Sequence, residues 1–438
     1  MMACRIQKLK MVQLLLEYGA DIDAAVALPN ASNNVDDEDF GQLEPDYAIA
    51  IAIDCRCADI FECLLTAGAD VSIKFVRKCK LMGEHYQYAL SVLEYIIVLD
   101  EMGMLRCLFC HVRDFEQVRS CANAALGLAI SLDRSSMVEM FCNDKTNTID
   151  INAPCDYNSS IVQTEIGQSP LEIAVLCKHT DILRILLEAG AEIKAHMCVR
   201  EDMIPIVLFA AESDDITLCR MLLMAGASLY ETHPHSHKTA LIAAVQNRNL
   251  DMVKMITELG CMKEDAVYSD TFFNAHDATT AHTALTMAVQ NSDTEIVEEL
   301  LCLAAVDVNV MKGTTYKSSA RNAGTHAAHT LGTTAISIAI ANSNLNIVRL
   351  LLQTGEVYLN DQQFNGEVHP LVLAMQIGNY AVIQALLKSG ASLASLEYIP
   401  SHEQSEQFRK IIDADKFSKK LWRVVLDPVV TKQAGSPV

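Results

Sequence analysis

The segment Cys107-Leu108-Phe109-Cys110-His111 carries the residues with the most specific chemistry in this chain. Two cysteines three positions apart, followed at once by a histidine, match C-x-x-C-H, in which the thiols attach a c-type haem. The N-terminus shows no export signal of the kind that normally accompanies haem attachment. Cys107 also falls at an apolar position of a helix, so we predict that the match is coincidental and that the protein has no cofactor.

Histidines recur in the polar connections of the second half of the chain. His233, His235 and His237 alternate with other residues, and four more follow at His276, His282, His326 and His329. Imidazole suits Zn²⁺ and Ni²⁺, but no cysteine or carboxylate joins these histidines at a known ligand spacing. Short His-rich tracts are also typical of solvated loops. We predict no metal ligands, while both interpretations of the histidines stay open.

An acidic block follows the first helical segment. The stretch 21–46 contains eight carboxylates and no Lys or Arg, and its densest part is Asp36, Asp37, Glu38 and Asp39. A calcium loop is disfavoured because the regular EF-hand spacing is absent. Such a block is typical of a solvated loop, and the sharper hypothesis is a docking site for a basic partner. We therefore include these four residues among the candidate protein-binding positions.

No arrangement typical of catalysis is recognisable. The chain has no phosphate-binding glycine loop, nucleophile elbow, zinc-protease motif or kinase set. Several carboxylates, Asp181, Asp251 and Glu295 among them, fall in the first turn of a predicted helix, where they complement the helix dipole. We predict that the protein is not an enzyme.

The elements that hold these residues are paired short helices, seen most clearly in residues 333–355. Ile336, Ala339 and Ile340 share one helical face, and a second helix carries its apolar residues at the same spacing, from Ile347 to Leu352. Polar residues 342–344 separate the two helices, and Gly355 suits the left-handed residue that ends a helix. Helices this short are not stable alone in water, so the pair must stack on copies of itself.

Copies of this pair recur in the same register along the chain. The offset of 19 residues from Ile336 to Gly355 also joins Ile49–Gly68, Leu171–Gly190, Val207–Gly226, Leu241–Gly260 and Leu371–Gly390. Weaker copies begin at Leu93, Leu126 and Leu285, and an incomplete first copy ends at Gly19. Alanine stands three residues after the anchor in every copy from residue 49 onward except the third, which has Ile96. We expect a close helix contact at these alanines and a local distortion near Ile96.

The repeat resembles the ankyrin family. Thr239-Ala240-Leu241 and Ser169-Pro170-Leu171 are similar to its T-P-L helix opening, and Gly68-Ala69-Asp70-Val71 to its G-A-D-V-N loop. The family's histidine after T-P-L is absent, so its usual capping hydrogen bond is expected to be missing. The resemblance implies an all-α ankyrin-repeat solenoid of about ten repeats over residues 1–395, the first truncated, that acts as a protein–protein interaction scaffold or adaptor.

Partner contacts in ankyrin proteins are expected on the finger loops and on the exposed end of each first helix. In this chain those helix ends are Gln246, Asn247, Gln290, Asn291, Ala341, Asn342, Gln376 and Ile377. Two alternative functions stay open: the ankyrin arm of a larger enzyme or channel, suggested by the truncated first repeat, and a substrate-recruiting adaptor of a ubiquitin ligase.

The residues after the repeats divide into two parts. Residues 396–426 are predicted to form a helical cap, because Ser401 and Gln404 make a capping box before an apolar helix face; a membrane-surface helix is the alternative. Residues 427–438 are predicted to be a disordered tail. The tail ends Ser436-Pro437-Val438, which resembles a PDZ-binding terminus.

Composition limits the classes of partner and compartment. The net charge is −21, from 55 acidic and 34 basic residues, which argues against nucleic acid and favours a basic partner protein. The fifteen cysteines are predicted to be reduced core residues, as at Cys63 and Cys219. No apolar run reaches the ~20 residues of a membrane span. We therefore expect a soluble protein of the cytoplasm, or alternatively of the nucleus.

Overall fold

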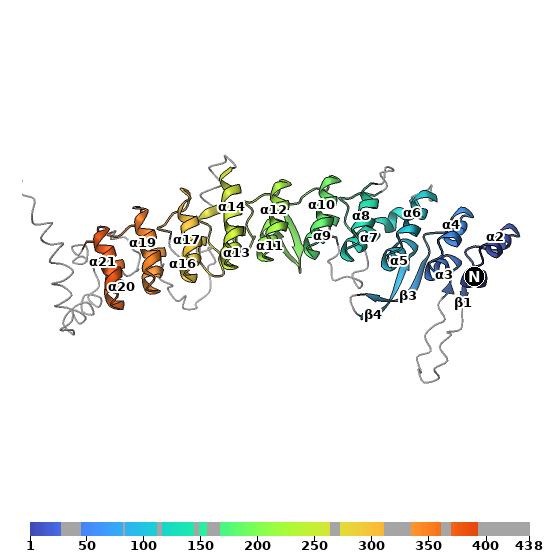
Figure 1. The fold of residues 1–438 in the computed structure, drawn as a ribbon, viewed down its shortest axis with the longest axis horizontal. Coiled ribbons are helices and arrows are strands. Elements are labelled where there is room, and N and C mark those ends of the chain that lie inside the picture. The colour runs from blue at the N-terminus through green and yellow to red at the C-terminus, as the bar shows by residue number, and fades with distance from the viewer. Residues whose placement is uncertain are drawn as a thin grey trace, which may run out of the picture. The chain divides into compact units, whose positions relative to one another are not determined.

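The computed structural model describes residues 1–27, 45–81, 84–111, 116–143, 149–155, 167–262, 272–310, 334–360 and 369–392. The chain divides into two compact units. Unit 1 comprises residues 1–206 and 224–227, and unit 2 comprises residues 207–223 and 228–438. Each unit is a row of antiparallel helix pairs (Figure 1).

Five helix pairs make up unit 1, with each first helix followed closely by its second. The pairs are α1 Met2–Arg5 with α2 Leu9–Glu17, α3 Ala48–Asp54 with α4 Ala58–Thr66, α5 Val92–Leu99 with α6 Met102–His111, α7 Glu116–Ser131 with α8 Ser135–Cys142, and α9 Pro170–Cys177 with α10 Thr180–Glu188. First helices pack on first helices and second helices on second helices, as in α3 against α5 and α4 against α6.

Five further pairs make up the described part of unit 2. They are α11 Ile206–Glu212 with α12 Ile216–Met224, α13 Ala240–Gln246 with α14 Leu250–Met262, α16 Ala284–Asn291 with α17 Thr294–Leu301, α18 Ala335–Ala341 with α19 Leu345–Gln353, and α20 Pro370–Ile377 with α21 Tyr380–Lys388. The same packing runs through this unit, from α13 to α16, α18 and α20 and from α14 to α17, α19 and α21. The predicted all-α repeat fold is confirmed.

The first helices are buried on almost every side. All residues from Ala240 to Val245 of α13 are buried, and so are Ala335 to Ile340 of α18. Ala244 and Ala339, at the predicted alanine position, are fully inaccessible to solvent. An apolar helix flanked by two neighbours on one side and its own second helix on another has no room for a larger side chain. The close helix contact predicted from the alanines is therefore present.

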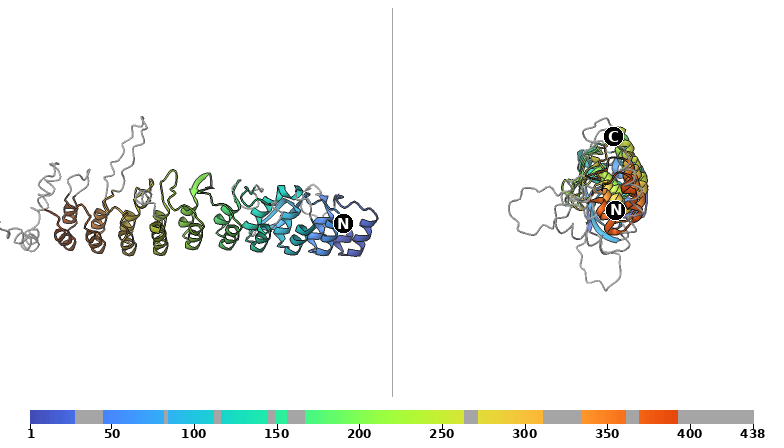
Figure 2. Two further views of the ribbon diagram at one scale, coloured as in Figure 1. Left: turned by 90° about the horizontal axis from the view of Figure 1, so that it is seen from above. Right: turned by 90° about the vertical axis from the view of Figure 1, so that its left-hand side faces the viewer.

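Three β-hairpins lie within the connections of unit 1. They are β1 Val26–Ala27 with β2 Pro45–Asp46, β3 Lys74–Leu81 with β4 Glu84–Ser91, and β5 His196–Val199 with β6 Asp202–Pro205, all antiparallel. The pairs β3–β4 and β5–β6 lie on the same side of the helix pairs of unit 1 (Figure 2). Phe75 and Leu90 face each other in the β3–β4 register and are buried, which anchors this hairpin to α5.

The distortion expected near Ile96 stays a prediction, but the third and fourth repeats carry additions that the other repeats lack. Phe75 packs edge-on against Tyr95 of α5 at 5.4 Å between ring centroids, and Ile96 is fully buried beside it in sequence. In the next repeat α7 begins at Glu116, ten residues before the anchor Leu126. A helical extension thus replaces the loop that precedes the other first helices.

The family's histidine is absent at the helix openings, and several first helices are capped by Ser or Thr instead. Ser169 accepts a hydrogen bond from the backbone N–H of Glu172, and the Glu172 carboxylate accepts one from the N–H of Ser169. Ser91 with Glu94 and Thr283 with Thr286 form the same reciprocal box. A Ser or Thr cap with an acceptor three residues later satisfies two of the helix's unpaired N–H groups without histidine.

The glycines predicted to end the second helices adopt the left-handed conformation at every predicted position except Gly260. Gly190 has φ +90° and Gly355 has φ +74°, the left-handed conformation that closes a helix. Gly260 is the exception, because it lies inside α14, which continues to Met262. A Cβ at Gly260 would lie 3.3 Å from the Phe273 ring, so glycine here permits close packing rather than a helix end.

Candidate protein-interaction surfaces

A ladder of side-chain hydrogen bonds connects successive fingers, where a finger is the segment between a second helix and the next first helix. In unit 1 the Asp23 carboxylate accepts from the N–H of Asp70 at 3.0 Å, and Asn152 Oδ1 accepts from the N–H of Glu192 at 2.9 Å. These bonds fix the spacing of neighbouring finger backbones. We call this set of contacts the finger ladder.

The finger ladder is doubled in unit 2 because each of its asparagines also donates. Asn309 Oδ1 accepts from the N–H of Tyr358 at 2.9 Å, and its Nδ2 donates to the carbonyl of Glu356 at 2.9 Å. Asn274 bonds Asp307 and Ala305 in the same way, and Asn360 bonds Ser392 and Gly390. An amide can donate and accept at once, whereas a carboxylate only accepts, so asparagine holds two backbone groups of the next finger.

The predicted contact residues at the ends of the first helices are accessible, and two of them have structural partners. Gln246, Gln290, Gln376 and Ile377 are exposed. Asn247 donates through Nδ2 to the carbonyl of Ala211 at 2.9 Å, at the end of the preceding first helix. Asn342 reaches the carbonyls of Val289 and Gln290 in the same manner, at 3.4 and 3.3 Å. These two asparagines satisfy helix-terminal carbonyls, so they also stabilise the stack.

Charged pairs occupy the turns between the first and second helices. Arg134 Nη1 lies 2.8 Å from the Asp100 carboxylate, and Arg248 Nε lies 2.9 Å from that of Asp293. Each of these turns contains one residue in the left-handed conformation, which is mostly not glycine, as at Asp100, Arg248 and Ser292. Neighbouring turns are therefore joined by ion pairs between side chains. Neighbouring fingers are joined mainly by hydrogen bonds from a side chain to the backbone of the next finger.

The C-x-x-C-H motif lies on the outer helix α6. His111 Nδ1 is 2.9 Å from the Cys107 carbonyl, and its Nε2 is 3.5 Å from the Glu62 carboxylate. Cys107 is half-buried, and this burial raises the pKa of its thiol. Both imidazole nitrogens thus have protein partners, and the helical position predicted for Cys107 is confirmed.

The histidines near residue 235 are organised by local hydrogen bonds. His233 Nδ1 accepts from the N–H of Ser236 at 3.1 Å and faces the N–H of His235 at 3.3 Å. His282, also a finger histidine, is buried with its Nδ1 3.2 Å from the Thr286 hydroxyl. Within the described ranges no three His, Cys, Asp or Glu side chains cluster as a metal site would require. Two further histidines of the series, at 326 and 329, lie outside those ranges.

The cysteines divide between the core and the edges of grooves. Cys219 is fully buried, as predicted, and burial raises the pKa of its thiol to about 12. Cys63 is only half-buried, so its predicted core position was wrong. Cys63 lies two residues after the buried Phe61 on α4, and its side chain lines the groove between α4 and α2.

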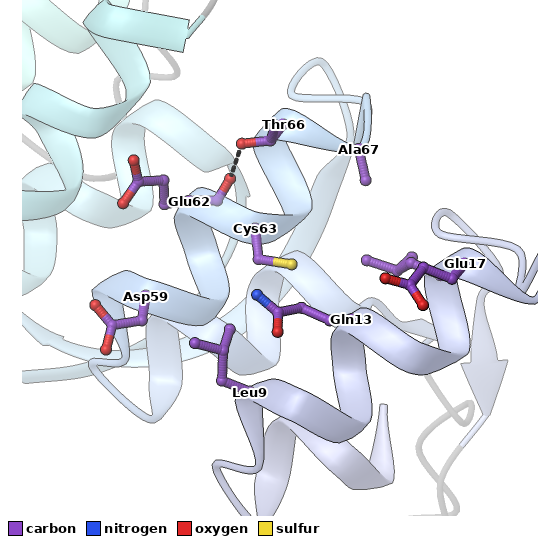
Figure 3. A pocket seen from close by; sticks show the side chains of 9 residues that line it. Leu9, Gln13, Glu17, Asp59, Glu62, Cys63, Thr66 and Ala67 are labelled. Atoms are coloured by element: carbon purple, nitrogen blue, oxygen red, sulfur yellow. Dashed lines mark hydrogen bonds between the residues drawn. The ribbon is translucent and has the colours of Figure 1, made fainter.

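Grooves run between neighbouring second helices, and their charge differs along the chain. The groove between α2 and α4, about 500 Å³, is lined by carboxylates of Glu17, Asp59 and Glu62 and by apolar parts of both helices. Gln13 and Cys63 face each other across it (Figure 3). The groove between α19 and α21, about 230 Å³, is lined instead by Arg349 and Lys388. The outer surface is therefore acidic at one groove and basic at another.

Two exposed apolar side chains on the fingers were not anticipated from the sequence. Tyr358 is 59% exposed in unit 2, and Met203, on β6 of unit 1, is 47% exposed. The finger ladder places Tyr358 in register with Asp70 and Glu192, because the N–H of each is held by the preceding finger. Counting from the glycine gave no signal, since Val71 and Ile193 also stand three residues after theirs. Tyrosine and methionine are enriched in the central part of protein–protein interfaces.

Several predicted features fall outside the described residues. They are the acidic block Asp36, Asp37, Glu38 and Asp39, the helical cap 396–426 and the tail 427–438. They stay predictions. Among the helices that are described, none combines the length and apolar character that a membrane crossing would need.

Stacked helix pairs joined by laddered fingers define the class of protein. Family models for ankyrin repeats match residues 207–312 and 314–395 as a three-copy unit and residues 1–26 and 166–197 as single repeats. The chain belongs to the ankyrin repeat family.

The chain is also similar to two named proteins. The Nuclear factor NF-kappa-B p105 subunit of Gallus gallus is 26% identical over 174 residues, which span 39% of this chain and 16% of that relative. The ankyrin repeat domain of Bcl-3, a member of the IkappaB protein family, is 21% identical with a TM-score of 0.43. That alignment covers 60% of this chain and 97% of the Bcl-3 domain.

Proposed function

We propose that this protein is a scaffold or adaptor that binds partner proteins through its fingers and the adjoining ends of its first helices. The observation that carries the proposal is the finger ladder, which fixes neighbouring finger backbones through Asn274, Asn309 and Asn360. The side chains at the finger surface take little part in these bonds. A preorganised surface loses less conformational freedom when a partner binds.

Tyr358 and Met203 are the strongest candidates for anchors within this surface. Interfaces depend on a few large side chains, with tyrosine prominent among them. The Tyr358 backbone is held by Asn309 at 2.9 Å while its side chain is more than half exposed. A rigid backbone with a free aromatic ring offers contact area at a low entropic cost.

The partner is proposed to present a basic surface. Among the described residues, the fingers carry exposed acidic residues at Glu192, Asp307 and Glu356, and the whole chain has a net charge of −21. Complementary charge speeds association and selects against acidic partners. The acidic block Asp36, Asp37, Glu38 and Asp39 is part of this proposal as the densest negative segment of the sequence.

Site-specific photocrosslinking tests where partners bind. A benzophenone amino acid is introduced singly at Tyr358 and Glu192 on the fingers and, as matched exposed controls, at Arg184 and Arg220 on the second helices. We expect the same partner proteins to be captured at the finger positions and not at the controls. Equal capture at all four positions, or capture from the second helices alone, would contradict a finger-based interface.

The charge of the partner is tested separately. Neutralising Asp36, Asp37, Glu38 and Asp39 to Asn or Gln should reduce partner capture more at low salt than at high salt, because salt screens exposed charges. Capture that is unchanged at every salt concentration would show that the acidic block is only a loop.

The remaining parts of the proposal concern compartment and context. We place the protein in the cytoplasm, with the nucleus as the alternative, because cysteines such as Cys219 serve as small core residues with free thiols, as is usual in reducing compartments. The chain is assigned no catalytic role. An ankyrin arm of a larger enzyme or channel, or a ubiquitin-ligase adaptor, would use the same finger surface, so the crosslinked partners distinguish these contexts.

A further inference from the structure

Two neighbouring fingers of unit 2 turn polar and aromatic side chains outward. In the finger after α17, Val306 and Val308 are buried, and Asp307 between them is exposed. In the finger after α19, Leu359 is buried and Tyr358 beside it is more than half exposed. Alternate residues of an extended backbone point to opposite sides. This alternation of burial therefore places Asp307 and Tyr358 on the outer side of their fingers.

A second carboxylate lies on the same finger as Tyr358. Glu356 stands two residues before the tyrosine and is exposed, and Val357 between them is half-buried. Two residues of an extended backbone span about 7 Å, so the Glu356 carboxylate and the Tyr358 ring project from one side within reach of a common ligand. Among the described residues, neither this carboxylate nor the Tyr358 hydroxyl takes part in a hydrogen bond or an ion pair.

The finger ladder fixes these three side chains relative to one another. The N–H of Asp307 is held by Asn274 and that of Tyr358 by Asn309, both at 2.9 Å, so Asp307 and Tyr358 occupy the same place on adjacent fingers. Asp307 Oδ1 also accepts from the N–H of Asn309 at 2.8 Å, and Asn309 Nδ2 donates to the carbonyl of Glu356. One asparagine thus connects all three residues. We call Asp307, Glu356 and Tyr358 the finger triad.

The chemistry of the finger triad suits one kind of cation. The described residues of the two fingers, 302–310 and 354–360, contain two carboxylates and no Lys or Arg. An aromatic face attracts cations, and arginine is found there more often than lysine. A guanidinium is planar and weakly hydrated, so it can lie flat on the ring while it donates in a fork to a carboxylate. A lysine ammonium is a strongly hydrated point charge and gains less from the ring.

We propose that the finger triad binds an arginine side chain of the partner protein, with the guanidinium stacked on Tyr358 and paired with Glu356 and Asp307. This inference rests on the proposed finger interface and names the residue that the partner inserts there. Tyr358 then acts as a cation-binding ring and not only as apolar contact area. The laddered backbones hold the three groups in place, which lowers the entropic cost of the contact.

Binding of short capped peptides to the full chain tests the inference. The probes are Ac-Gly-Gly-Arg-Gly-Gly-amide and its analogues with lysine or citrulline in place of arginine. Citrulline has nearly the shape of arginine but no charge. NMR titration, followed at the backbone amide of residue 358, should show saturable binding of the arginine peptide. The lysine peptide should bind about two- to fivefold more weakly, and the citrulline peptide should not bind.

Substitutions separate the ring, the charge and the apolar area. Tyr358→Phe keeps the aromatic face and should bind the arginine peptide as the unmodified chain does. Tyr358→Leu keeps only apolar area and should weaken binding about two- to fivefold. Glu356→Gln should weaken it by up to about fivefold, because an exposed ion pair is lost. The matched control Glu298→Gln, at an exposed carboxylate on the second helix α17, should leave binding unchanged.

Three results would overturn the arginine site: no binding of the arginine peptide, equal binding of the arginine and lysine peptides, or undiminished binding by Tyr358→Leu. A loss in Glu298→Gln as large as that in Glu356→Gln would also overturn it, because the peptide would then respond to the overall negative charge. Photocrosslinking at Tyr358 distinguishes this failure from failure of the proposed function. Partner capture on the fingers without an arginine preference leaves the finger interface standing and removes only the arginine site.

Discussion

Replacing Asn309 tests whether the finger ladder contributes to stability. Its side chain makes two bonds to the next finger, accepting from the N–H of Tyr358 and donating to the carbonyl of Glu356, both at 2.9 Å. Both bonds are accessible to water, so each contributes about 0.5–1.5 kcal/mol net. We expect Asn309→Ala to lower the free energy of unfolding by about 1–2 kcal/mol.

The substitution Asn309→Asp distinguishes the contributions of the two bonds to stability. A carboxylate still accepts from the Tyr358 N–H but has no proton for the Glu356 carbonyl, so the expected loss is about 1 kcal/mol. Asn152 provides the matched control, because only its acceptor bond, to the N–H of Glu192, is present among the described residues. Asn152→Asp should therefore change the stability by less than about 0.5 kcal/mol.

Amide hydrogen exchange with residue-level resolution measures the acceptor bond directly. The Tyr358 amide should exchange several-fold faster in Asn309→Ala, since about 1 kcal/mol of protection is lost, and at nearly the original rate in Asn309→Asp. Denaturant unfolding supplies the free energies. If the Tyr358 amide exchanges equally fast in all three proteins, Asn309 does not hold this finger and the reasoning is refuted.

Three further outcomes follow from the packing. Ala339→Leu, at a fully buried position, should cost about 1–3 kcal/mol, whereas Gln246→Leu on the exposed helix end should cost far less; the reverse order of denaturation midpoints would contradict the repeat register. Ser292→Gly should stabilise the chain by about 1 kcal/mol, because Ser292 has φ +61° and glycine adopts this conformation without a steric penalty; a lowered melting temperature would show that the turn is not strained. In thiol labelling at pH 8, exposed Cys110 should react in the folded protein, while Cys219, whose pKa is raised to about 12 by burial, should react only after unfolding; prompt labelling of Cys219 would refute its burial.

The register of the repeats could be predicted from the sequence, because it depends only on the spacing of apolar residues along the chain. Ala244 and Ala339 are buried at the predicted helix contact, and Asp181 lies in the first turn of α10. The capping boxes were also readable, since Ser169 and Glu172 stand three residues apart before an apolar run. The capping boxes were not predicted, because only the family's histidine was considered as a capping residue.

Other features depend on contacts that no local pattern records. Gly260 matches the helix-ending offset, yet α14 continues past it because Phe273 and Leu229 pack against the glycine. One signal was available: Gly190 is followed by small and polar residues, whereas Gly260 is followed by Cys261 and Met262. The bond from Asn247 to Ala211 joins residues 36 positions apart, so its structural role appears only once the helix pairs are stacked.

The finger ladder also bears on how the chain folds. Its bonds join residues one repeat apart, from 30 positions for Asn360 and Gly390 to 49 for Asn309 and Tyr358. The entropic cost of closing a loop rises only slowly with its length, so each repeat docks onto its neighbour at a similar cost. Folding within a unit can then start at any helix pair and spread to the next, as in other repeat proteins. During synthesis, a finished repeat can serve as the template for the one that follows it from the ribosome.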